Sequence, residues 1–303
     1  MVKVPKKATT VILVRQMDLG FEVFLLKRHE KSSFMGGNYV YPGGMVDLED
    51  GLPEICSRCI GLSPEEAQRV LGGMISQEES IGFWVAGIRE LFEEAGILLA
   101  YDPMCRPFVL QNRINHEKVS FYRQSLQKGE LTLLRIAEKE GFCLALDQLH
   151  YYAHWITPEA MPQRFDTRFF LARHPLGQEA SYDQEETTEG LWLSPRMAIE
   201  QNLKGEIVLS PPTLKTLEDL SKFKSPEDLF RSLQGKEIQT VLSIFSKVAD
   251  HTLLVYPWDP DYEIFKRGEI PDPLNFGRPS EPGDNSTRLL FKDGRWHLYC
   301  RTS

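Results

Sequence analysis

The pattern of apolar and polar positions near the N-terminus predicts two strands. Residues 8–16, ATTVILVRQ, and 22–28, EVFLLKR, are rich in β-branched and aromatic side chains, and a Gly-containing turn separates them. The Gly-rich stretch 36–47, GGNYVYPGGMVD, breaks this pattern and contains one proline. We expect it to form a loop around a short extended piece.

Helical signals dominate the next part of the chain. Residues 63–78 open with a serine, a proline and two glutamates, which is a typical helix start. A second helix is predicted over 81–95, ending near Gly96. Residues 113–139 are predicted to be helical with mixed polarity.

Strands and helices are mixed in the second half of the chain. Strands are predicted at 151–157, 167–172 and 190–193, and helices at 194–202, 210–223 and from about Ser225. After about residue 250, Pro, Gly and Asp become frequent and predict a loop-dominated tail. The tail closes with a hairpin at 288–300 around Lys-Asp-Gly. The whole order indicates an α/β chain around one sheet.

Composition and charge limit the class of protein to which the chain can belong. The chain has 303 residues, of which 42% are hydrophobic and 26% charged, as in ordinary globular proteins. No apolar run approaches the roughly 20 residues that a membrane span needs, so no membrane association is expected. The short apolar run at the N-terminus is interpreted as the first strand and not as a signal peptide.

The acidic balance argues against a polyanionic partner. The net charge is −8, which disfavours nucleic-acid binding through phosphate neutralisation. The five cysteines are an odd, scattered set, which suits a reducing cytoplasm. Cys56 and Cys59 form one CxxC, but no second pair completes a zinc site, so the pair is interpreted as incidental.

The candidate chemistry lies in the stretch 84–100, WVAGIRELFEEAGILLA. Glu90, Glu93 and Glu94 stand at helical spacing and share one face, where like charges repel. Two interpretations fit: a solvated acidic face, or a site for a hard cation such as Mg²⁺. The other sides of the helix are apolar, which favours a packed helix and therefore the cation. Arg89 can pair with Glu93 across one turn.

These residues resemble the Nudix box. RELFEEAGI at 89–97 fits every fixed position of its second half, and YPGGMVD at 41–47 resembles its opening, with Gly44 as the box glycine. Asp50 stands where the pattern has Glu. Between Asp50 and Arg89 lie 38 residues instead of seven, an insertion of 31. The resemblance runs from about residue 8 to about residue 222.

The resemblance implies a fold and a domain organisation. The expected fold is the Nudix α/β/α sandwich with a mixed sheet over residues 1–222, carrying a helical insertion at about 51–80. Residues 223–303 are expected to form an extension of a helix, a Pro- and Gly-rich loop and a hairpin. This extension either covers the substrate cleft or forms a homodimer contact, and the sequence does not choose between them.

The resemblance also implies a metal-dependent hydrolase that cleaves the diphosphate of a nucleoside diphosphate linked to another moiety. Mg²⁺ or Mn²⁺ would be held by Glu90, Glu93 and Glu94 and by the carbonyl of Gly44 or its neighbour Gly43. Glu93, Glu90 and Arg89 are expected to be catalytic. The base that takes a proton from water is either a box glutamate or a later one in the loop DQEETTEGLW at 183–192, where Glu186 and Glu185 are the candidates and Glu189 a weaker one.

Several side chains are candidates for substrate contact. Arg28, Arg164 and Arg168, and also Lys27, could hold phosphate oxygens, or pair with nearby acids instead. Tyr41 could stack on a base, as could Tyr39, Phe34 and Trp155. The interpretation of each of these aromatic residues as part of the core is favoured.

The sequence points to a substrate class without fixing it. YVYPGGMVDLED, AGIRELFEEAGILLA, WITPEAMPQRFDTRFFLA and EETTEGLWLSP resemble the coenzyme A diphosphatase group of Nudix enzymes. Its upstream signature keeps Leu25-Leu26, Gly37 and Pro42-Gly43-Gly44 here, but Ser33 replaces an expected arginine. Coenzyme A or an acyl-coenzyme A is therefore one candidate, beside ADP-ribose, NADH and nucleotide sugars. A non-catalytic nucleotide sensor is the alternative of a different class, while the acidic pI argues against RNA decapping.

Overall fold

A mixed sheet forms the centre of the molecule. The structure, a computed structural model, describes residues 3–32, 35–110, 114, 116–248, 250–271 and 274–301. Within these ranges the central sheet has seven strands in the order β10 (Thr240–Leu242), β7 (His150–Ile156), β8 (Phe165–Arg173), β1 (Lys6–Gln16), β2 (Phe21–Arg28) and β3 (Tyr39–Val40), with β9 (Thr187–Leu193) also on β2. The β1–β8 pair is parallel and β1–β2 is antiparallel, which confirms the predicted α/β class with a mixed sheet.

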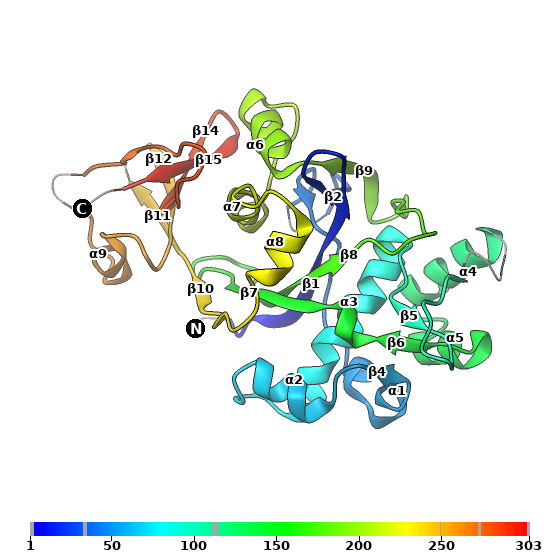
Figure 1. The fold of residues 1–303 in the computed structure, drawn as a ribbon. Helices are drawn as coiled ribbons and strands as arrows, with labels where there is room; N and C mark the ends of the chain where they lie inside the picture. Colours follow the sequence, from blue (N-terminus) through cyan, green and yellow to red (C-terminus); the bar gives the residue numbers. More distant parts are fainter. Residues whose placement is uncertain are drawn as a thin grey trace.

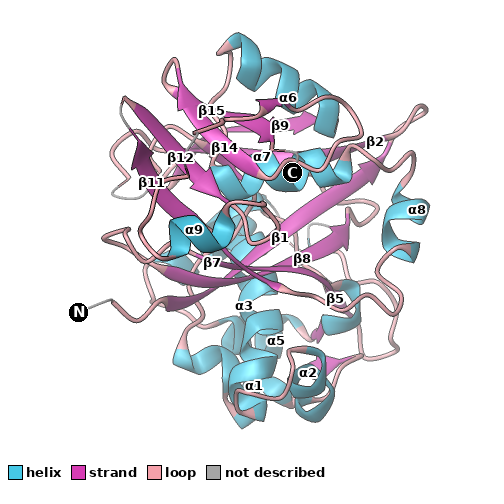
Figure 2. Ribbon diagram, turned by 90° about the vertical axis from the view of Figure 1, so that its left-hand side faces the viewer, coloured by secondary structure: helices cyan, strands magenta, loops and turns pink. Residues whose placement is uncertain are grey.

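The sequence of β1 explains why the sheet is covered on both faces. Val11 and Leu13 are buried in one core cluster, and Ile12 and Val14 in another. Successive side chains of a strand point to opposite faces, so a continuous apolar run requires two covering layers. Helix α3 (Gln77–Ala95) packs in the first cluster and α7 (Pro211–Leu220) in the second. Figure 2 shows α3 and α7 on opposite sides of the sheet.

The remaining helices of the second face follow β9. Helix α6 (Pro195–Lys204) lies directly after β9, and α8 (Pro226–Arg231) follows α7. Ala198 of α6 and Leu229 of α8 are fully buried in the same cluster as α7. The three predicted helices of this region are therefore confirmed, each opened by a serine N-cap and a proline.

Two excursions from the domain together build a helical lobe, seen at the lower right of Figure 1. The first contains η1 (Leu48–Gly51), α1 (Pro53–Cys56), β4 (Cys59–Ile60) and α2 (Pro64–Val70). The second contains β5 (Ala100–Tyr101), α4 (His116–Gln127), α5 (Leu133–Glu140), β6 (Cys143–Ala145) and η3 (Leu146–Gln148). β6 pairs with β4 and with β5, so one small sheet joins the two excursions.

Glycines shorten two predicted helices. The helix expected over 63–78 ends at Val70, because Gly72 and Gly73 have φ angles of 89° and 76°, outside the right-handed helical region. Helix α3 then begins at Gln77, earlier than predicted. The helix expected over 113–139 is two helices, α4 and α5, separated at Gly129 with φ 67°.

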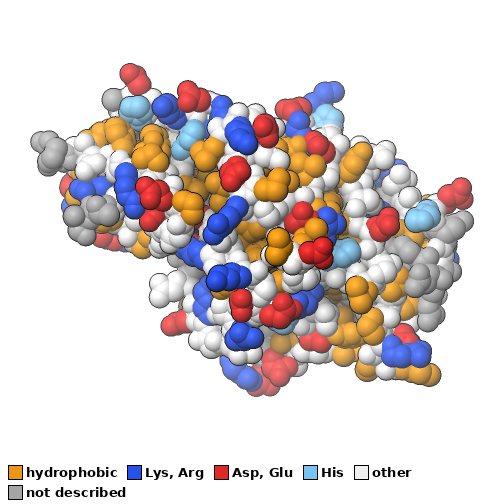
Figure 3. All heavy atoms as spheres, turned by 45° about the horizontal axis from the view of Figure 1, so that its top comes forward, with side chains coloured by type: hydrophobic (Ala, Val, Ile, Leu, Met, Phe, Trp, Pro, Cys, Tyr) orange, Lys and Arg blue, Asp and Glu red, His pale blue; other side chains and the backbone are white. Residues whose placement is uncertain are grey.

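The C-terminal extension is more ordered than its composition predicts. It forms a second sheet from β11 (Ile244–Val248), β12 (His251–Val255), β14 (Arg288–Lys292), β15 (Arg295–Cys300) and β13 (Arg278–Pro279), with α9 (Tyr262–Lys266) beside it. Between residues 256 and 287 the described part of the chain forms only α9 and β13, as expected of a loop-dominated stretch, while β11 and β12 lie before it and were not predicted. The predicted hairpin at 288–300 is confirmed as β14–β15. On the face in Figure 3, acidic and basic side chains are interspersed.

Buried charges attach this extension to α7 and hold its own sheet together. Lys215 of α7 is 1% exposed and donates to Glu218, Asp219 and Asn285. Glu218 in turn accepts from Ser280 and Ser286. Inside the extension, the fully buried Arg288 pairs with Asp259 and Asp261. Among the residues described, no helix has the length and apolarity to cross a membrane.

Replacing Arg288 with Leu is expected to lower the free energy of unfolding by about 3–5 kcal/mol, because it removes the buried guanidinium that pairs with both carboxylates and leaves Asp261 to Arg301 and Asp259 to a backbone N–H. The measurement is denaturant unfolding followed by tryptophan fluorescence. Arg278→Leu is the matched control, since Arg278 makes an exposed pair with Asp284 and should change little. Equal losses of unfolding free energy in the two variants would show that the buried ion pairs contribute no more to stability than the exposed pair.

Candidate active site

Local signals define the helix that carries the three glutamates. Ser76 caps α3 by accepting from the backbone N–H of Glu79 at 3.1 Å, and Gly96 ends it with φ 71°. From Ser80 to Ile88 each residue of the helix is buried. In its last turns, Glu93 and Glu94 are 7% and 4% exposed. The carboxylate face therefore lies inside the molecule, which excludes the interpretation as a solvated surface.

The Pro-Gly-Gly loop packs directly against these carboxylates. β1 holds the loop by donating from Thr9 N–H to the Gly44 carbonyl at 2.9 Å. The N–H of Gly43 donates to Glu94 Oε2 at 2.9 Å. A Cβ atom on Gly44 would stand 2.4–2.6 Å from the carboxylate of Glu90 and would displace that side chain. A Cβ atom on Gly43 would stand 2.3 Å from the backbone carbonyl of Thr9, so glycine is required there for the loop to lie against β1.

Arg89 gathers the acidic side chains. Its Nη1 donates to Glu90 Oε1 at 2.8 Å and to Glu93 Oε1 at 3.3 Å, so the predicted pairing with Glu93 is present. Its Nη2 also donates to the Met45 carbonyl at 2.8 Å. The guanidinium therefore screens the carboxylates from one another and ties them to the loop.

Asp50, at the position where the Nudix pattern has Glu, completes this network. It is 4% exposed and accepts from Arg89 Nε at 3.0 Å and from Nη2 at 2.9 Å. The backbone N–H of Asp47 donates to Asp50 as well, at 2.9 Å. The shorter side chain reaches Arg89 because η1 lies against α3. Asp50 precedes the insertion and Arg89 follows it, so this contact joins the two ends of the insertion.

Burial changes the protonation of the glutamates. Desolvation raises the pKa of Glu93 to about 7, partly offset by the charge of Arg89. Burial also raises the pKa of Glu90, and burial together with the charge of Glu90 raises that of Glu94. Near neutral pH the three side chains therefore carry less than their full negative charge, and a bound cation would favour the charged form.

The residues fit a divalent metal ion in their donor chemistry. Buried carboxylate oxygens beside backbone carbonyls are the ligands that hard cations prefer, and the Gly44 cradle leaves no side chain between Glu90 and the loop. As the side chains stand, no three Asp, Glu, His or Cys groups in the described part of the chain converge closely enough to hold an ion. Glu90 and Glu93 are turned to Arg89 instead, so binding requires a rotation of these side chains.

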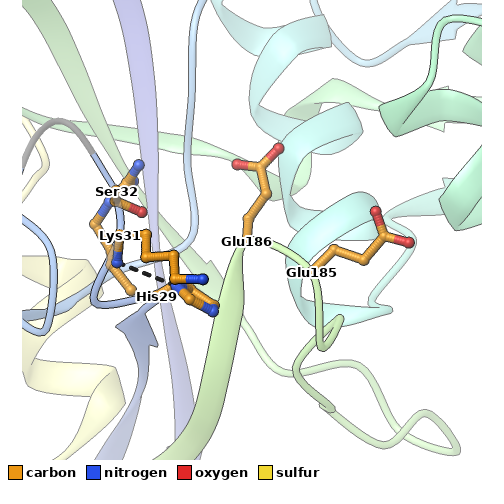
Figure 4. A pocket seen from close by; sticks show the side chains of 6 residues that line it. His29, Lys31, Ser32, Glu185 and Glu186 are labelled. Atoms are coloured by element: carbon orange, nitrogen blue, oxygen red, sulfur yellow. Dashed lines mark hydrogen bonds between the residues drawn. The ribbon is translucent and has the colours of Figure 1, made fainter.

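A cleft opens beside this cluster. It has a volume of about 390 Å³ and is lined by Arg28, His29, Lys31, Ser32, Glu185 and Glu186. A basic wall from the end of β2 thus faces an acidic wall from the segment before β9, as Figure 4 shows. Arg28 lines the cleft, and its Nε is buried without a hydrogen-bond partner within the described ranges.

The three glutamates before and in β9 differ in their surroundings. Glu189 accepts from the Tyr39 hydroxyl and is therefore engaged. Glu185 and Glu186 are exposed in the cleft. The charge of Glu186 contributes to the raised pKa of both Glu93 and Glu94, so its carboxylate faces the helix cluster.

Other predicted contact residues lie elsewhere. Tyr41 and Trp155 are buried in the cluster on the α7 face, which supports their interpretation as core. Arg164 is 8% exposed and donates to the carbonyls of Thr157 and Lys3. Arg168 is 6% exposed and pairs with Asp166. The structure does not bring these three groups of residues to the cleft, because their side chains are buried with protein partners.

Two smaller predictions have a simple outcome. Lys27 pairs with Glu30 at 3.4 Å on the surface, and Ser33 and Phe34 lie outside the described residues. Burial raises the pKa of the Cys59 thiol to about 12, so the CxxC pair is not activated, as expected of an incidental motif.

Sequence reasoning missed the cleft residues His29 and Lys31. It predicted a helix over 113–139 but missed the roles of Arg123 and Gln127 in α4, which contact the end of α3 and the segment before β9. These residues stand in ordinary polar surroundings in the sequence. No local motif marks them, because their partners come from distant parts of the chain.

Comparisons with known proteins agree with this architecture. The family model of the NUDT19 Nudix domain matches residues 4–220. Acyl-coenzyme A diphosphatase NUDT19 of Gallus gallus is 30% identical over 288 residues, covering 80% of this chain and 74% of that protein. Its Xenopus laevis counterpart is 28% identical over 315 residues, covering 91% and 82%. A crystal structure of a NUDIX hydrolase from Alicyclobacillus acidocaldarius shares the fold, with a TM-score of 0.63 and 23% identity over 79% of this chain and all of that one.

The raised pKa of Glu93 predicts how stability depends on pH. In EDTA the folded state holds a proton that the unfolded state has released, between the unfolded value of 4.5 and the folded value of about 7. The contribution is therefore fully present below 4.5 and is lost as the pH rises through about 7, up to about 3 kcal/mol in total. Melting temperatures across this range should fall less steeply for Glu93→Gln than for the wild type. Identical slopes would contradict the burial of this carboxylate.

Proposed function

The chain belongs to the Nudix hydrolases and is a Nudix diphosphohydrolase, and from this premise we propose that it cleaves the diphosphate bond of coenzyme A or an acyl-coenzyme A with Mg²⁺ or Mn²⁺. One observation carries the proposal. The complete set of Arg89, Glu90, Glu93 and Glu94 is buried against the Pro-Gly-Gly loop, beside a cleft that holds Arg28.

The choice of substrate rests on the relatives and on the cleft. The two NUDT19 relatives carry the name acyl-coenzyme A diphosphatase. The stretch from Leu25 to Gly44 keeps most of the signature of coenzyme A hydrolases, apart from Ser33. Lys31 stands two positions before Ser33 and lines the cleft, so it supplies a cation where the expected arginine is absent.

The residues have distinct tasks in the proposed reaction. Glu90, Glu93 and Glu94, with the carbonyl of Gly43 or Gly44, would hold the divalent ions. When bound, these ions screen the charge of the diphosphate and lower the pKa of the attacking water. Through its contacts with Glu90 and Glu93, Arg89 gathers the glutamates beside the loop before they turn to the ions.

The cleft residues would act on the substrate and on water. Arg28, which lines the cleft, donates from its guanidinium to a phosphate oxygen. Glu186 accepts the proton of the attacking water, whose oxygen forms a bond to one phosphorus as the bond from that phosphorus to the bridging oxygen breaks. The second phosphate leaves with the bridging oxygen.

A nucleotide sensor that binds without cleavage is the alternative of a different class. The intact carboxylates favour the enzyme, because binding alone does not need three buried acids at one loop. ADP-ribose, NADH and nucleotide sugars share the diphosphate and are competing substrates within the enzyme class.

The proposal also covers the class of partner, the cellular compartment and the role of the C-terminal extension. The net charge of −8 supports a small-molecule substrate over a nucleic acid, and the free cysteines suit a reducing cytoplasm. The extension remains a candidate for a cover over the cleft or for a homodimer contact, and the molecular mass in solution distinguishes these roles.

A hydrolysis panel tests the proposal. With Mg²⁺ or Mn²⁺, the wild type is expected to cleave coenzyme A or acyl-coenzyme A faster than NADH, ADP-ribose, a diadenosine polyphosphate or a nucleotide sugar. Glu93→Gln should lower the rate by about 10²–10⁴-fold, as expected when a positioned catalytic group is lost. The exposed Glu130→Gln is the matched control. If no compound is cleaved but one raises the melting temperature, the sensor is the correct function.

Lys31→Met tests the basic wall of the cleft. Coenzyme A carries a third phosphate, on its ribose, that dephospho-coenzyme A lacks. The variant is expected to lower kcat/KM for coenzyme A by about 5–10-fold, roughly the value of one charge-assisted contact, and to leave that for dephospho-coenzyme A nearly unchanged. An equal loss for both compounds would show that Lys31 acts on the diphosphate or not on the substrate at all.

A further inference from the structure

We infer that helix α4 sets the position of the proposed base: Arg123 and Gln127 are positioning residues that act through Glu186. The inference rests on the proposed function, because it concerns the same reaction. The segment in question is residues 181–187, named here the acidic loop, which carries Glu186 at the edge of the cleft.

Arg123 ties the acidic loop to the end of the glutamate helix. Its Nε donates to the Glu93 carbonyl at 3.0 Å, and its Nη2 to the Glu94 carbonyl at 2.9 Å. The same guanidinium donates to the hydroxyl and to the carbonyl of Ser181, each at 2.9 Å. The last carbonyls of a helix lack intrahelical partners and favour positive charge, so α3 offers a firm anchor for this contact.

Gln127 fixes the middle of the same loop. It lies one turn after Arg123, on the same face of α4. Its amide donates to Asp183 Oδ2 at 2.7 Å. The other oxygen of Asp183 accepts from the backbone N–H groups of Glu185, Glu186 and Thr187 at 2.9–3.0 Å. Gln127 therefore holds the carboxylate around which the backbone of Glu186 is folded.

Two backbone hydrogen bonds also hold the acidic loop in place. The N–H of Ser181 donates to the Ala95 carbonyl at 2.9 Å, and the N–H of His29 donates to the Glu186 carbonyl at 2.9 Å. The acidic loop is thus joined to α3, α4 and the end of β2. These contacts leave the Glu186 side chain exposed in the cleft while its backbone is fixed.

Together, these contacts of the acidic loop determine the distance between Glu186 and the metal-binding glutamates. Arg123 contacts the backbone of Glu93 and Glu94 on one side and the loop on the other, so a change on α4 moves one carboxylate relative to the others. A displacement of about 1 Å in a reacting group can cost about 100-fold in rate. The residues that line the cleft come from the end of β2 and from the acidic loop, and none of them belongs to α4. Helix α4 therefore acts on the acidic loop and not on the substrate.

The experiment compares Gln127→Leu with Gln124→Leu. Gln124 is an exposed glutamine on the same helix and serves as the matched control. Gln127→Leu is expected to lower kcat by about 10–100-fold, as supporting contacts typically do, with KM changed by less than about 3-fold. Gln124→Leu should match the wild type. A wild-type kcat for Gln127→Leu would overturn the inference.

A double-mutant cycle shows whether the effect passes through Glu186. In the Glu186→Gln background, adding Gln127→Leu is expected to cost less than about 2-fold, because the group being positioned is already lost. If the fold-changes in kcat of the two substitutions multiply, Gln127 does not act through Glu186. Its role would then be a general structural one. Arg123→Met, which keeps the apolar stem, should show the same dependence on Glu186.

Hydrogen–deuterium exchange gives a readout that does not require turnover. The amides of Glu185, Glu186 and Thr187 should exchange faster in Gln127→Leu than in the wild type, and Gln124→Leu should not change them. If the wild type cleaves no compound of the panel, the proposed function fails, while the exchange rates still decide whether α4 holds the loop. Unchanged exchange in Gln127→Leu would contradict the inference whatever the activity.

Discussion

The contacts of Arg89 with the buried acids are the interaction on which the site depends. Burial alone would keep the glutamates of α3 protonated, and their mutual repulsion would oppose a packed helix. By donating to Glu90, Glu93 and Asp50, the guanidinium makes the cluster compatible with the core. A buried ion pair adds little net stability. Its value here is positional, because it keeps several oxygens ready beside the Pro-Gly-Gly loop.

The parts of the site that could be predicted are those defined by neighbours in sequence. Spacing, apolar flanks and Gly96 identify the glutamate helix, and the two glycines identify the loop that approaches it. The role of Asp50 could not be predicted, since it depends on the chain returning after the insertion so that Arg89 lies within hydrogen-bond distance of Asp50. Arg168 misled for a related reason: an arginine on a strand has the same pattern whether its partner is a phosphate or Asp166.

The misses in the fold have a similar origin. Strands β4, β5 and β6 have only two or three residues, too few for any periodicity, and exist because the two excursions meet. The helix expected over 63–78 ends early because of Gly72 and Gly73. The positive φ angles of these two glycines outweigh the helical pattern around them. In the extension, β11 and β12 have only five residues each and pair with each other just before the Pro-rich stretch, so their short runs were not identified as strands.

The parallel pairing of β1 with β8 constrains how the chain acquires its structure during synthesis. Lys6 pairs with Phe165 and Val14 with Arg173, so β1 has no partner on this side until most of the domain has left the ribosome. The intervening loop is long, and contacts of such separation slow folding and prolong the exposure of apolar strands to other chains. The helical lobe contains about half of that segment. Once β4 and β6 pair, Ile60 lies beside Ala145, which shortens the effective separation of β1 and β8, so the lobe that supports the acidic loop in the mature protein also shortens the search that closes the central sheet.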